Sequence, residues 1–364
     1  MDWKRIFNLN QIEVLGLDIG SSAVKIVALH KDNAGYIVTT CGIAEIRVSE
    51  DSNNTQIAQQ VGNNPNTVKA IRDCFVLSKL RTKRRLETKS VVCGVNGPEV
   101  AVRNFEFPPL PAEEMEGAVA LEASQVCPFN AAESAVDYQL IPNGDDKARG
   151  FLVAATNTLI ADKVQLAKAA NLKCILMDVD GLALLNCFNG LVNEHKKAQT
   201  NPTTAILNVG ASNTTLAIMD NNGQPFVRDT NYSGKDIIKQ IAAENGMSIE
   251  TIKGILYNDS TAVEPEFYNS FRKACQKLIS DVDETLRYYT AQSKSSNVEK
   301  LFVCGGFALA GGFVELLNSR LGIEAVLWNP FAEMRCDANR QCEDILAKKG
   351  PAMAVAAGLA MRSS

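Results

Sequence analysis

The sequence predicts an α/β protein whose two halves are related by duplication, and three observations support this prediction. Segments with strand-like and helix-like patterns alternate along the whole chain, which is typical of α/β architecture. The chain has 364 residues, which is long enough for two or more domains that each bury their own core. A strand–glycine–strand pattern near the start of the chain recurs with an offset of 190 residues, as an internal duplication would produce.

The first part of the chain reads as a hairpin followed by a helix and a strand. Two β-rich runs, 14–19 and 24–29, are joined by a turn of glycine and two serines. Apolar residues at helical spacing predict a helix over 66–80, and a short apolar run predicts a strand over 90–95. The prolines at 108–111 then precede the next helix, because proline is favoured at or before the first helical turn.

The remaining elements continue this alternation. The rest of the first half is expected to contain strands at 137–141, 151–156 and 174–179 and helices at 159–170 and 182–192. The polar stretch 194–202 marks a boundary between the halves. The second half is expected to contain a hairpin over 207–219, a buried strand from 301 and a helix at 314–321.

Composition and charge exclude several classes of function. The chain carries 37 basic and 41 acidic side chains, and a formal net charge of −4 gives no basic surface for nucleic acid. No run approaches 18 consecutive apolar residues, so we expect no membrane-spanning helix. The first residues lack the apolar core of a secretory signal. We therefore expect a cytoplasmic protein that binds no nucleic acid.

The cysteines and histidines predict neither a disulfide framework nor a metal centre. The ten cysteines are spread through the chain without a C-x-x-C pair, and several lie inside apolar runs. We therefore expect them to be small buried hydrophobic residues in a reducing compartment. Only two histidines are present, which disfavours a histidine-based metal site.

The repeated pattern covers residues 17–29 and 207–219. Both copies read apolar residue, carboxylate or amide, apolar residue, glycine, two small residues and a second apolar strand. The offset aligns Asp18 with Asn208 and Gly20 with Gly210. Duplication of a strand–turn–strand unit explains this match better than coincidence does.

Such a turn is suited to binding an anion. Glycine lets backbone N–H groups converge on a phosphate, and small hydroxyl residues add donors. Lys25 on the returning strand is placed to reach the same phosphate as a point charge. Asp18 at the strand end can hold Mg²⁺ directly or through water, because hard cations prefer oxygen ligands. For either hairpin alone, a plain tight turn remains the alternative.

A third glycine-rich segment follows the buried strand that starts at 301. Glycines after a strand let a flat ligand lie against the backbone, and the following helix N-terminus favours anions. The spacing from Gly306 to Gly311 is that of a P-loop, but Gly312 and Phe313 stand where lysine and serine or threonine are required. The chain also has no G-x-G-x-x-G, which removes the simplest dinucleotide site.

These motifs together resemble the actin, sugar-kinase and Hsp70 superfamily. Within it, the sequence is similar to the PilM family of type IV pilus assembly proteins, which is related to FtsA. The segments that carry this resemblance beyond the glycine turns are FPPLP at 107–111, EGAVALEA at 116–123, PF at 128–129, DYQ at 137–139, DVDGLALL at 178–185, SGKDI at 233–237 and GPAMAVAAGLA at 350–360. The resemblance is collinear from about residue 14 to residue 362.

The resemblance implies an actin-like (ribonuclease H-like) duplicated two-lobe fold, with an inserted α/β subdomain and a central nucleotide cleft. The implied N-terminal lobe comprises 1–88 and 174–200, with the C-terminal helix at 350–364 packing back on it. The inserted subdomain of the FtsA and PilM type comprises 89–173. The C-terminal lobe comprises 201–349, and 231–297 forms its helical outer subdomain.

The resemblance also implies a site for ATP and Mg²⁺ between the lobes. The implied phosphate and adenosine contacts are Asp18, Gly20, Ser21, Ser22 and Lys25 in the first loop; Asn208, Gly210, Ala211, Ser212 and Thr214 in the second; Gly305, Gly306 and Gly311 in the adenosine loop; and Gly234 and Lys235 near the ribose or adenine edge. Asp180 falls where many relatives place the acid that orients the attacking water. Asp18 would hold Mg²⁺ through water, so these two aspartates are the candidate catalytic residues.

The sequence departs from the wider superfamily at Asn208, where many relatives have an aspartate. A neutral amide supplies no negative charge to organise hydrated Mg²⁺ and water. We therefore expect a nucleotide-responsive scaffold with slow ATP hydrolysis at best.

The resemblance further implies a location on the cytoplasmic face of the inner membrane, which the protein reaches only through a partner. That partner is a PilN-like single-span membrane protein, whose N-terminal cytoplasmic tail would bind in a groove between the N-terminal lobe and the inserted segment. Self-association is a further expectation.

Two other functions remain as alternatives. A small-metabolite kinase of the same superfamily would use Asp178 or Asp180 as its general base, but a glycine-rich substrate loop of the sugar-kinase type is not evident. An FtsA-like division filament is disfavoured, because FtsA relatives end in a linker and an amphipathic membrane helix. This sequence instead stops directly after a helix of small residues.

Overall fold

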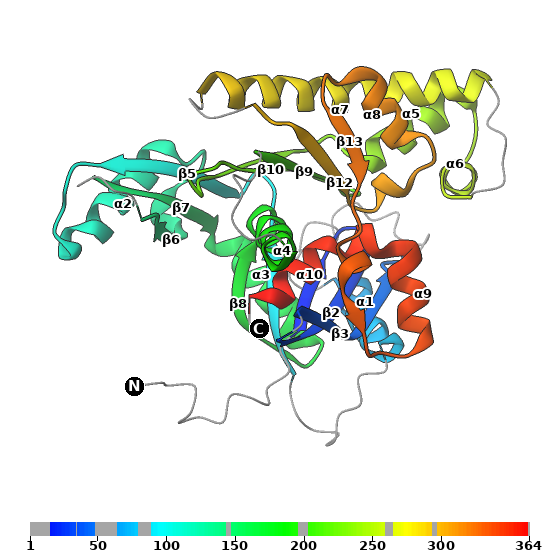
Figure 1. Cartoon of the computed structure of the whole chain (residues 1–364). Coiled ribbons are helices and arrows are strands. Elements are labelled where there is room, and N and C mark those ends of the chain that lie inside the picture. The colour runs from blue at the N-terminus through cyan, green and yellow to red at the C-terminus, as the bar shows by residue number, and fades with distance from the viewer. Residues whose placement is uncertain are drawn as a thin grey trace.

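The frame of the molecule consists of three β-sheets with helices on their faces (Figure 1). The computed structural model describes residues 15–33, 35–47, 64–78, 89–142, 147–195, 203–258, 265–292 and 297–362. Most of the predicted boundary at 194–202, the last two residues of the helix predicted over 66–80 and the first residue of the strand predicted at 14–19 lie outside these ranges.

The first sheet has six strands in the order β14-β3-β2-β1-β4-β8. Its strands are β1 (Leu15–Ile19), β2 (Ala23–Asp32), β3 (Gly35–Glu45), β4 (Lys89–Val95), β8 (Leu172–Val179) and β14 (Arg335–Cys336). β1, β2 and β3 pair antiparallel, whereas β4 runs parallel to both β1 and β8. All five residues of β1 are buried, as its unbroken pattern of mostly apolar residues predicts for a central strand.

The second sheet has five strands in the order β11-β10-β9-β12-β13. Its strands are β9 (Thr204–Val209), β10 (Thr214–Met219), β11 (Pro225–Thr230), β12 (Lys300–Cys304) and β13 (Glu324–Leu327). β9, β10 and β11 pair antiparallel, and β12 runs parallel to β9 and β13. Strand order and directions therefore repeat those of β3-β2-β1-β4-β8, as duplication of a common unit requires.

Two helices lie between these sheets. α4 (Asp180–His195) packs against β10 and β11, and α10 (Ala354–Met361) packs against β1, β2, β4 and α4. Every residue of α10 is buried, and a side chain at Gly358 would collide with the Ala183 carbonyl of α4. The run of small residues in α10 thus lets two helices approach closely and joins the two lobes into one core.

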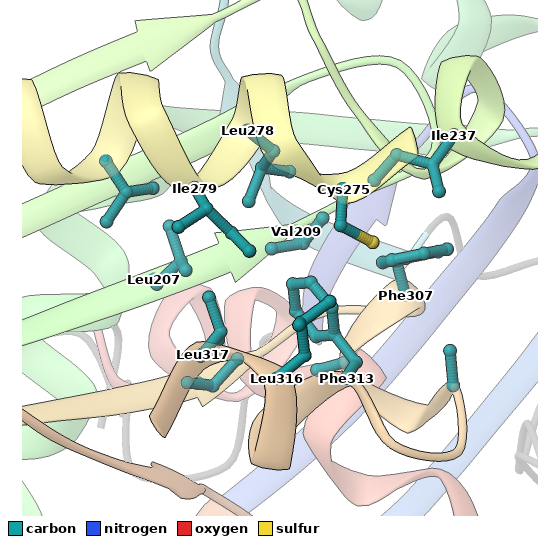
Figure 2. Close-up of a cluster of buried hydrophobic side chains, with 14 of the residues drawn as sticks. Leu207, Val209, Ile237, Cys275, Leu278, Ile279, Phe307, Phe313, Leu316 and Leu317 are labelled. Carbon is teal, nitrogen blue, oxygen red and sulfur yellow. The ribbon is translucent and has the colours of Figure 1, made fainter. Parts of the chain in front are cut away.

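The outer faces of the two sheets are covered by separate groups of helices. α1 (Pro65–Leu77) and α3 (Asn157–Ala169) cover the first sheet, and Asn64 caps α1 by accepting a hydrogen bond from the Asn66 N–H. The second sheet carries α5 (Gly234–Asn245), α6 (Ile249–Leu256), α7 (Pro265–Gln292) and α8 (Phe313–Arg320). Figure 2 shows the apolar side chains that pack between β9, α5, α7 and α8.

The third sheet is small and has the order β5-β7-β6. It consists of β5 (Val100–Phe107), β6 (Ser134–Leu140) and β7 (Ala148–Thr156), and α2 (Ala112–Val126) packs on one face. This unit projects from the side of the molecule (Figure 1). β5 also lies against β11, so the unit contacts the second sheet.

The strands β3, β5, β11, β13 and β14 were not predicted from the sequence. β5 reads VAVRNFEF, and the exposed polar residues Arg103 and Asn104 interrupt its apolar pattern. Antiparallel strands with one open face can carry such residues, which weakens the sequence signal.

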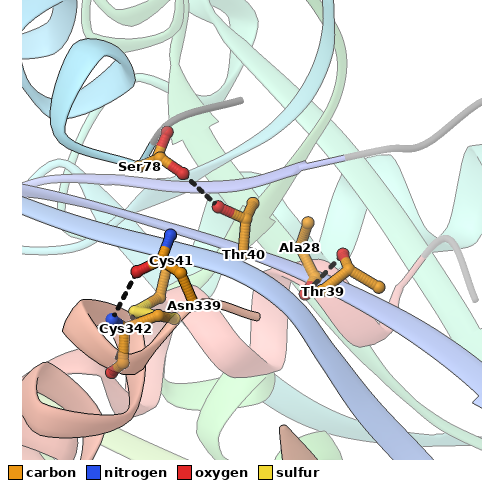
Figure 3. The surroundings of a disulfide bond; sticks show 7 residues. All are labelled: Ala28, Thr39, Thr40, Cys41, Ser78, Asn339 and Cys342. Carbon is orange, nitrogen blue, oxygen red and sulfur yellow. Dashed lines mark hydrogen bonds between the residues drawn. A yellow bond between two sulfur atoms is a disulfide. The ribbon is translucent and has the colours of Figure 1, made fainter. Parts of the chain in front are cut away.

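One prediction about the cysteines was wrong. Cys41 on β3 and Cys342 on α9 (Arg340–Lys349) form a disulfide, with their Cα atoms 5.7 Å apart (Figure 3). Beside it, Asn339 caps α9 and Thr40 donates a hydrogen bond to the Ser78 carbonyl at 2.7 Å. The two cysteines are 301 residues apart in the sequence, so spacing alone gave no sign of their pairing. The other eight cysteines are free.

Within the described ranges, no helix combines the length and the apolar character needed to cross a bilayer.

Candidate functional site

Parallel strands bring chemically useful residues to one edge of each main sheet. In the first sheet, the carboxyl ends of β1, β4 and β8 lie side by side and lead to Asp18, Asn96 and Asp180. In the second sheet, the ends of β9 and β12 lead to Gly210 and Gly305. In open α/β sheets, ligands bind outside the carboxyl ends of strands, so these edges are the candidate site.

The two repeated turns meet at this place. The loop between β1 and β2 and the loop between β9 and β10 are closed by the same kind of hydrogen bond, from Gly20 N–H to Ala23 O (3.2 Å) and from Gly210 N–H to Asn213 O (3.0 Å). The Ser212 hydroxyl donates to the Ser21 hydroxyl at 2.6 Å. Two loops from different lobes are therefore in direct contact.

Both loops present unused donors. Within the described part of the chain, no partner accepts from the backbone N–H groups of Ser21, Ser22, Ala211 and Ser212. Ser21 and Ser22 are exposed, and Ala211 and Ser212 are half-buried. Unpartnered backbone N–H groups in neighbouring turns can bind an anion.

The two charged side chains beside the first loop, Asp18 on β1 and Lys25 on β2, form an ion pair. Lys25 Nζ lies 2.9 Å from Asp18 Oδ2, and both side chains are largely buried. The pair arises from the hairpin itself, because Asp18 and Lys25 face each other in the β1–β2 register. An incoming anion would compete with Asp18 for the ammonium group of Lys25.

The start of α5 is hydrogen-bonded to the backbone of the second loop. The N–H groups of Gly234 and Lys235 donate to the carbonyls of Gly210 and Ala211 at 3.1 and 3.0 Å. Thr214 is buried, and its hydroxyl donates to the Tyr232 carbonyl at 2.9 Å. The SGKDI segment at 233–237 therefore contributes to the candidate site by holding the backbone of the second loop in place.

The third glycine-rich segment packs beside the second loop. Gly305 has a φ of +96°, and a Cβ there would collide with the Val209 carbonyl and lie 2.6 Å from Asn208 Oδ1. Gly306 is exposed, and a Cβ there would meet nothing within 4 Å. Gly311 is more remote, because its N–H donates to the Leu256 carbonyl at the end of α6.

Asp180 is the most perturbed acid of the site. Its side chain is 4% exposed at the first residue of α4, its Oδ2 accepts a hydrogen bond from Asn96 Nδ2, and its Oδ1 has no partner among the described residues. Burial raises the pKa of Asp180 to about 7, the nearby Asp18 carboxylate adds to the rise, and Lys163 opposes it. An unpartnered carboxylate oxygen can accept a hydrogen bond from water.

Three residues of the site were missed in the sequence. Lys163 on α3 donates from Nζ to the Ile19 carbonyl at 2.7 Å, Asn96 contacts Asp180, and Asp229 on β11 accepts from the Gly97 N–H at 2.8 Å. Asn96 directly follows a predicted strand, so the rule that strand ends gather gave a usable signal. Lys163 lies in mid-helix, where no motif marks it.

Asn96, Gly97, Asn213 and Asp229 connect the two lobes. Asn213 Nδ2 donates to Asn96 Oδ1 at 2.6 Å, and the Thr215 hydroxyl donates to Asp229 Oδ1 at 2.5 Å. Burial raises the pKa of Asp229, whereas its hydrogen bonds to Thr215 and the Gly97 N–H lower it. Gly97 and Asp229 also line a cavity of about 210 Å³.

The donor set suits a phosphate more than a free metal ion. Among the described residues, no group of three or more histidine, cysteine or acidic side chains is placed to hold a metal. Mg²⁺ is commonly held by one or two carboxylates together with substrate phosphates. Asp18 and the converging loop N–H groups fit that arrangement.

Comparison with known proteins finds a matching family and similar folds. A family model described as "Type IV pilus assembly protein PilM" matches residues 16–364. A structure of a "PilM-PilN type IV pilus biogenesis complex" contains a chain with 23% identity and a TM-score of 0.76, covering 97% of this chain and 99% of that one. The ethanolamine utilization protein EutJ from Carboxydothermus hydrogenoformans has 14% identity and a TM-score of 0.54, covering 95% and 88%. The archaeal actin homologue Ta0583 has 13% identity and a TM-score of 0.44, covering 96% and 99%.

The match to the chain of the PilM–PilN structure shows the mixed α/β, actin-like fold that the resemblance implied. At these identities the structural matches establish the fold alone.

Proposed function

The chain belongs to the PilM family of type IV pilus assembly proteins, and we propose that it acts as a nucleotide-binding scaffold in the inner-membrane assembly complex of the pilus. In this proposal it binds ATP and Mg²⁺ between its lobes and holds the cytoplasmic N-terminal tail of a PilN-like membrane protein. It is located at the inner face of the inner membrane and reaches the membrane through that partner.

The contact between the two glycine loops carries the nucleotide part of the proposal. The Ser21 and Ser212 hydroxyls lie 2.6 Å apart, although they come from opposite lobes. Four loop N–H groups around them have no partner within the described residues. A polyphosphate would replace the hydrogen bond between the two serines and accept hydrogen bonds from the N–H groups of both loops. It would thereby set the distance between the lobes.

The remaining residues fit the other parts of ATP–Mg²⁺. Lys25 would exchange part of its ion pair with Asp18 for the phosphate, and Asp18 would then be free to hold Mg²⁺ through water. The metal would supply positive charge that neutralises the phosphates. Gly305 and Gly306 would lie against the adenosine, since Gly306 has open space at its α-carbon.

Turnover is expected to be slow. Asp180 would orient a water only where nucleotide binding opens its buried Oδ1 to solvent, and Asn208 offers a neutral amide in the second repeat. Electrostatic stabilisation of a transition state depends on charge placed in advance. The site therefore favours binding of ATP over its hydrolysis.

The cavity beside Gly97 supports the partner part of the proposal. The homologous structure described as a PilM–PilN complex shows that a relative binds PilN. In this chain, the cavity lies where the first lobe, the β5–β7–β6 unit and β11 come together, and its walls include Val100, Val179 and Val227. Two exposed arginines, Arg103 and Arg228, stand at the same cavity. Its volume suits one large apolar side chain of an extended tail.

Isothermal titration with ATP–Mg²⁺, followed by a synthetic PilN-like tail peptide, tests both parts. Ser212→Glu places a charge in the phosphate loop and is expected to abolish ATP binding while the peptide still binds. Val100→Glu places a charge in the cavity and is expected to have the opposite effect. Each variant is thus the folding control of the other. If the parent protein binds neither ligand, the proposed function is wrong.

A further inference from the structure

One short turn contacts the second candidate nucleotide loop and also lines the cavity. Residues 96–99 join β4 to β5, and Asn96 and Gly97 each form a hydrogen bond that crosses between the lobes. Asn96 Oδ1 accepts from Asn213 of the second loop, and the Gly97 N–H donates to Asp229 of β11. The turn therefore contacts the second lobe at two points that lie next to each other in the sequence.

The Asn96 side chain makes a pair of contacts that an amide is suited to make. Its Nδ2 donates to Asp180 Oδ2, and its Oδ1 accepts from Asn213 Nδ2. A carboxylate at this position has no donor for Asp180, and an apolar side chain has neither group. The amide thus links the acid at the start of α4 to the second loop.

The backbone next to Asn96 has little freedom to move independently. Gly97 has a φ of +98°, and a Cβ there would lie 3.0 Å from Asn213 Nδ2. The Gly97 carbonyl also accepts a hydrogen bond from the Val100 N–H at 3.1 Å. A displacement of Gly97 therefore moves Asn96 with it, since the two are adjacent and both are held by bonds.

The same turn also lines the cavity. Gly97 and Pro98 line it together with Val100, and Asp229 lines it from the second lobe. An occupant of the cavity would thus contact both residues that form the Gly97–Asp229 hydrogen bond. A phosphate between the loops would displace the second loop, to which Asn96 is bonded.

We infer that Asn96 is a positioning residue that fixes the second loop relative to the first lobe and couples occupancy of the cavity to occupancy of the loops. The inference rests on the proposed function, because it assigns a regulation to the same two sites. Such coupling is reciprocal, so each ligand must change the affinity of the other by the same factor.

Titration of ATP–Mg²⁺ with and without saturating tail peptide measures the coupling. In the parent protein, the peptide is expected to change the ATP affinity by about fivefold or more. Asn96→Ala should still bind both ligands, but the peptide should change its ATP affinity by less than about twofold. Asn213→Ala removes the same bond from the other lobe and should also lose the coupling. Asn104→Ala, an exposed residue on β5, is the matched control and should keep it.

Hydrogen exchange distinguishes a failure of this inference from a failure of the proposed function. Addition of ATP–Mg²⁺ to the parent should change the exchange of amides in 97–103, and Asn96→Ala should abolish that change. This readout needs no peptide, so it decides the inference even if the tail does not bind. The coupling is overturned if ATP–Mg²⁺ leaves the exchange of amides in 97–103 of the parent unchanged, or if the ATP affinity is the same with and without bound peptide. Neither result contradicts the proposal that the protein binds the two ligands.

Discussion

The Ser212 hydroxyl donates a hydrogen bond to the Ser21 hydroxyl at 2.6 Å, across 191 positions of the sequence and between two lobes. The two serines lie in corresponding turns of a duplicated strand–turn–strand unit, at positions one residue apart in the repeat. Their contact holds the loops together in the state described here. Because neither hydroxyl is fully buried, a phosphate from solvent can replace the contact without first unfolding either loop.

Gly305 and Gly306 are expected to respond differently to the same change. Gly305→Ala introduces a left-handed backbone strain and a collision with the Val209 carbonyl, so we expect a loss of about 1–3 kcal/mol in the free energy of unfolding. Gly306→Ala points into open space and should leave stability nearly unchanged. Urea unfolding of both variants measures the difference. Equal midpoints for the two would contradict the described packing of Gly305 against the second loop.

The buried Asp180 is expected to make stability depend on pH. Its pKa is raised to about 7, mainly by burial and then by Asp18, with Lys163 opposing, whereas an aspartate in the unfolded chain has a pKa of about 3.9. Between these values the folded chain holds a proton that the unfolded chain releases. The contribution of Asp180 is therefore fully present below about pH 4 and lost as the pH rises through 7.

Unfolding of the parent and of Asp180→Asn at pH 5 and pH 8 checks this dependence. From pH 5 to pH 8 the variant should gain stability relative to the parent, by about 1.4 kcal/mol for each pH unit between 5 and the raised pKa. Asp137→Asn removes an exposed carboxylate and is the control. The expectation fails if the difference between parent and Asp180→Asn is the same at both pH values.

The disulfide between Cys41 and Cys342 is expected to stabilise the attachment of α9 to β3. Reduction of the parent should lower its unfolding free energy by about 2–4 kcal/mol, because the bond constrains the unfolded chain. Cys342→Ala should start at the lower value and show no response to reductant. Alkylation of the denatured, unreduced parent should label the eight free cysteines. Labelling of all ten would show that the bond is absent.

The amide of Asn208 is expected to limit ATP turnover. Asn208→Asp places a negative charge at the second loop, where it can organise Mg²⁺ and its water, so phosphate release should rise by about tenfold or more. Asn222→Asp, in the exposed turn after β10, is the control for a general charge effect. Steady-state phosphate release measures both. No gain in the Asn208 variant counts against the assigned role of this position.

The two glycine turns of the site could be predicted from the sequence, because the duplication leaves the same short pattern at 17–29 and 207–219. The aligned positions of Asp18 and Asn208, and of Gly20 and Gly210, mark two turns, and the fold places them in adjoining loops. The strands that carry these turns are buried and apolar, so their pattern is strong.

Contacts made by isolated side chains could not be predicted in the same way. Lys163 reaches the Ile19 carbonyl from the middle of a helix, and Cys41 meets Cys342 across the sheet edge. These pairings depend on how whole elements pack, and nothing in the spacing of the residues encodes them. Asn96 could be predicted only in part. Its position directly after a strand follows from the sequence, but its hydrogen bonds to Asp180 and Asn213 do not.

The most direct test of the account is the ATP–Mg²⁺ affinity of a Ser21→Cys/Ser212→Cys protein, measured by titration before and after reduction. A disulfide between these positions would lock the loops together at the contact that a phosphate must replace. The account predicts that the oxidised protein does not bind ATP and that reduction restores binding, while reductant leaves ATP binding by the parent unchanged. Equal ATP affinity in the locked and reduced forms would show that the nucleotide does not bind between these loops.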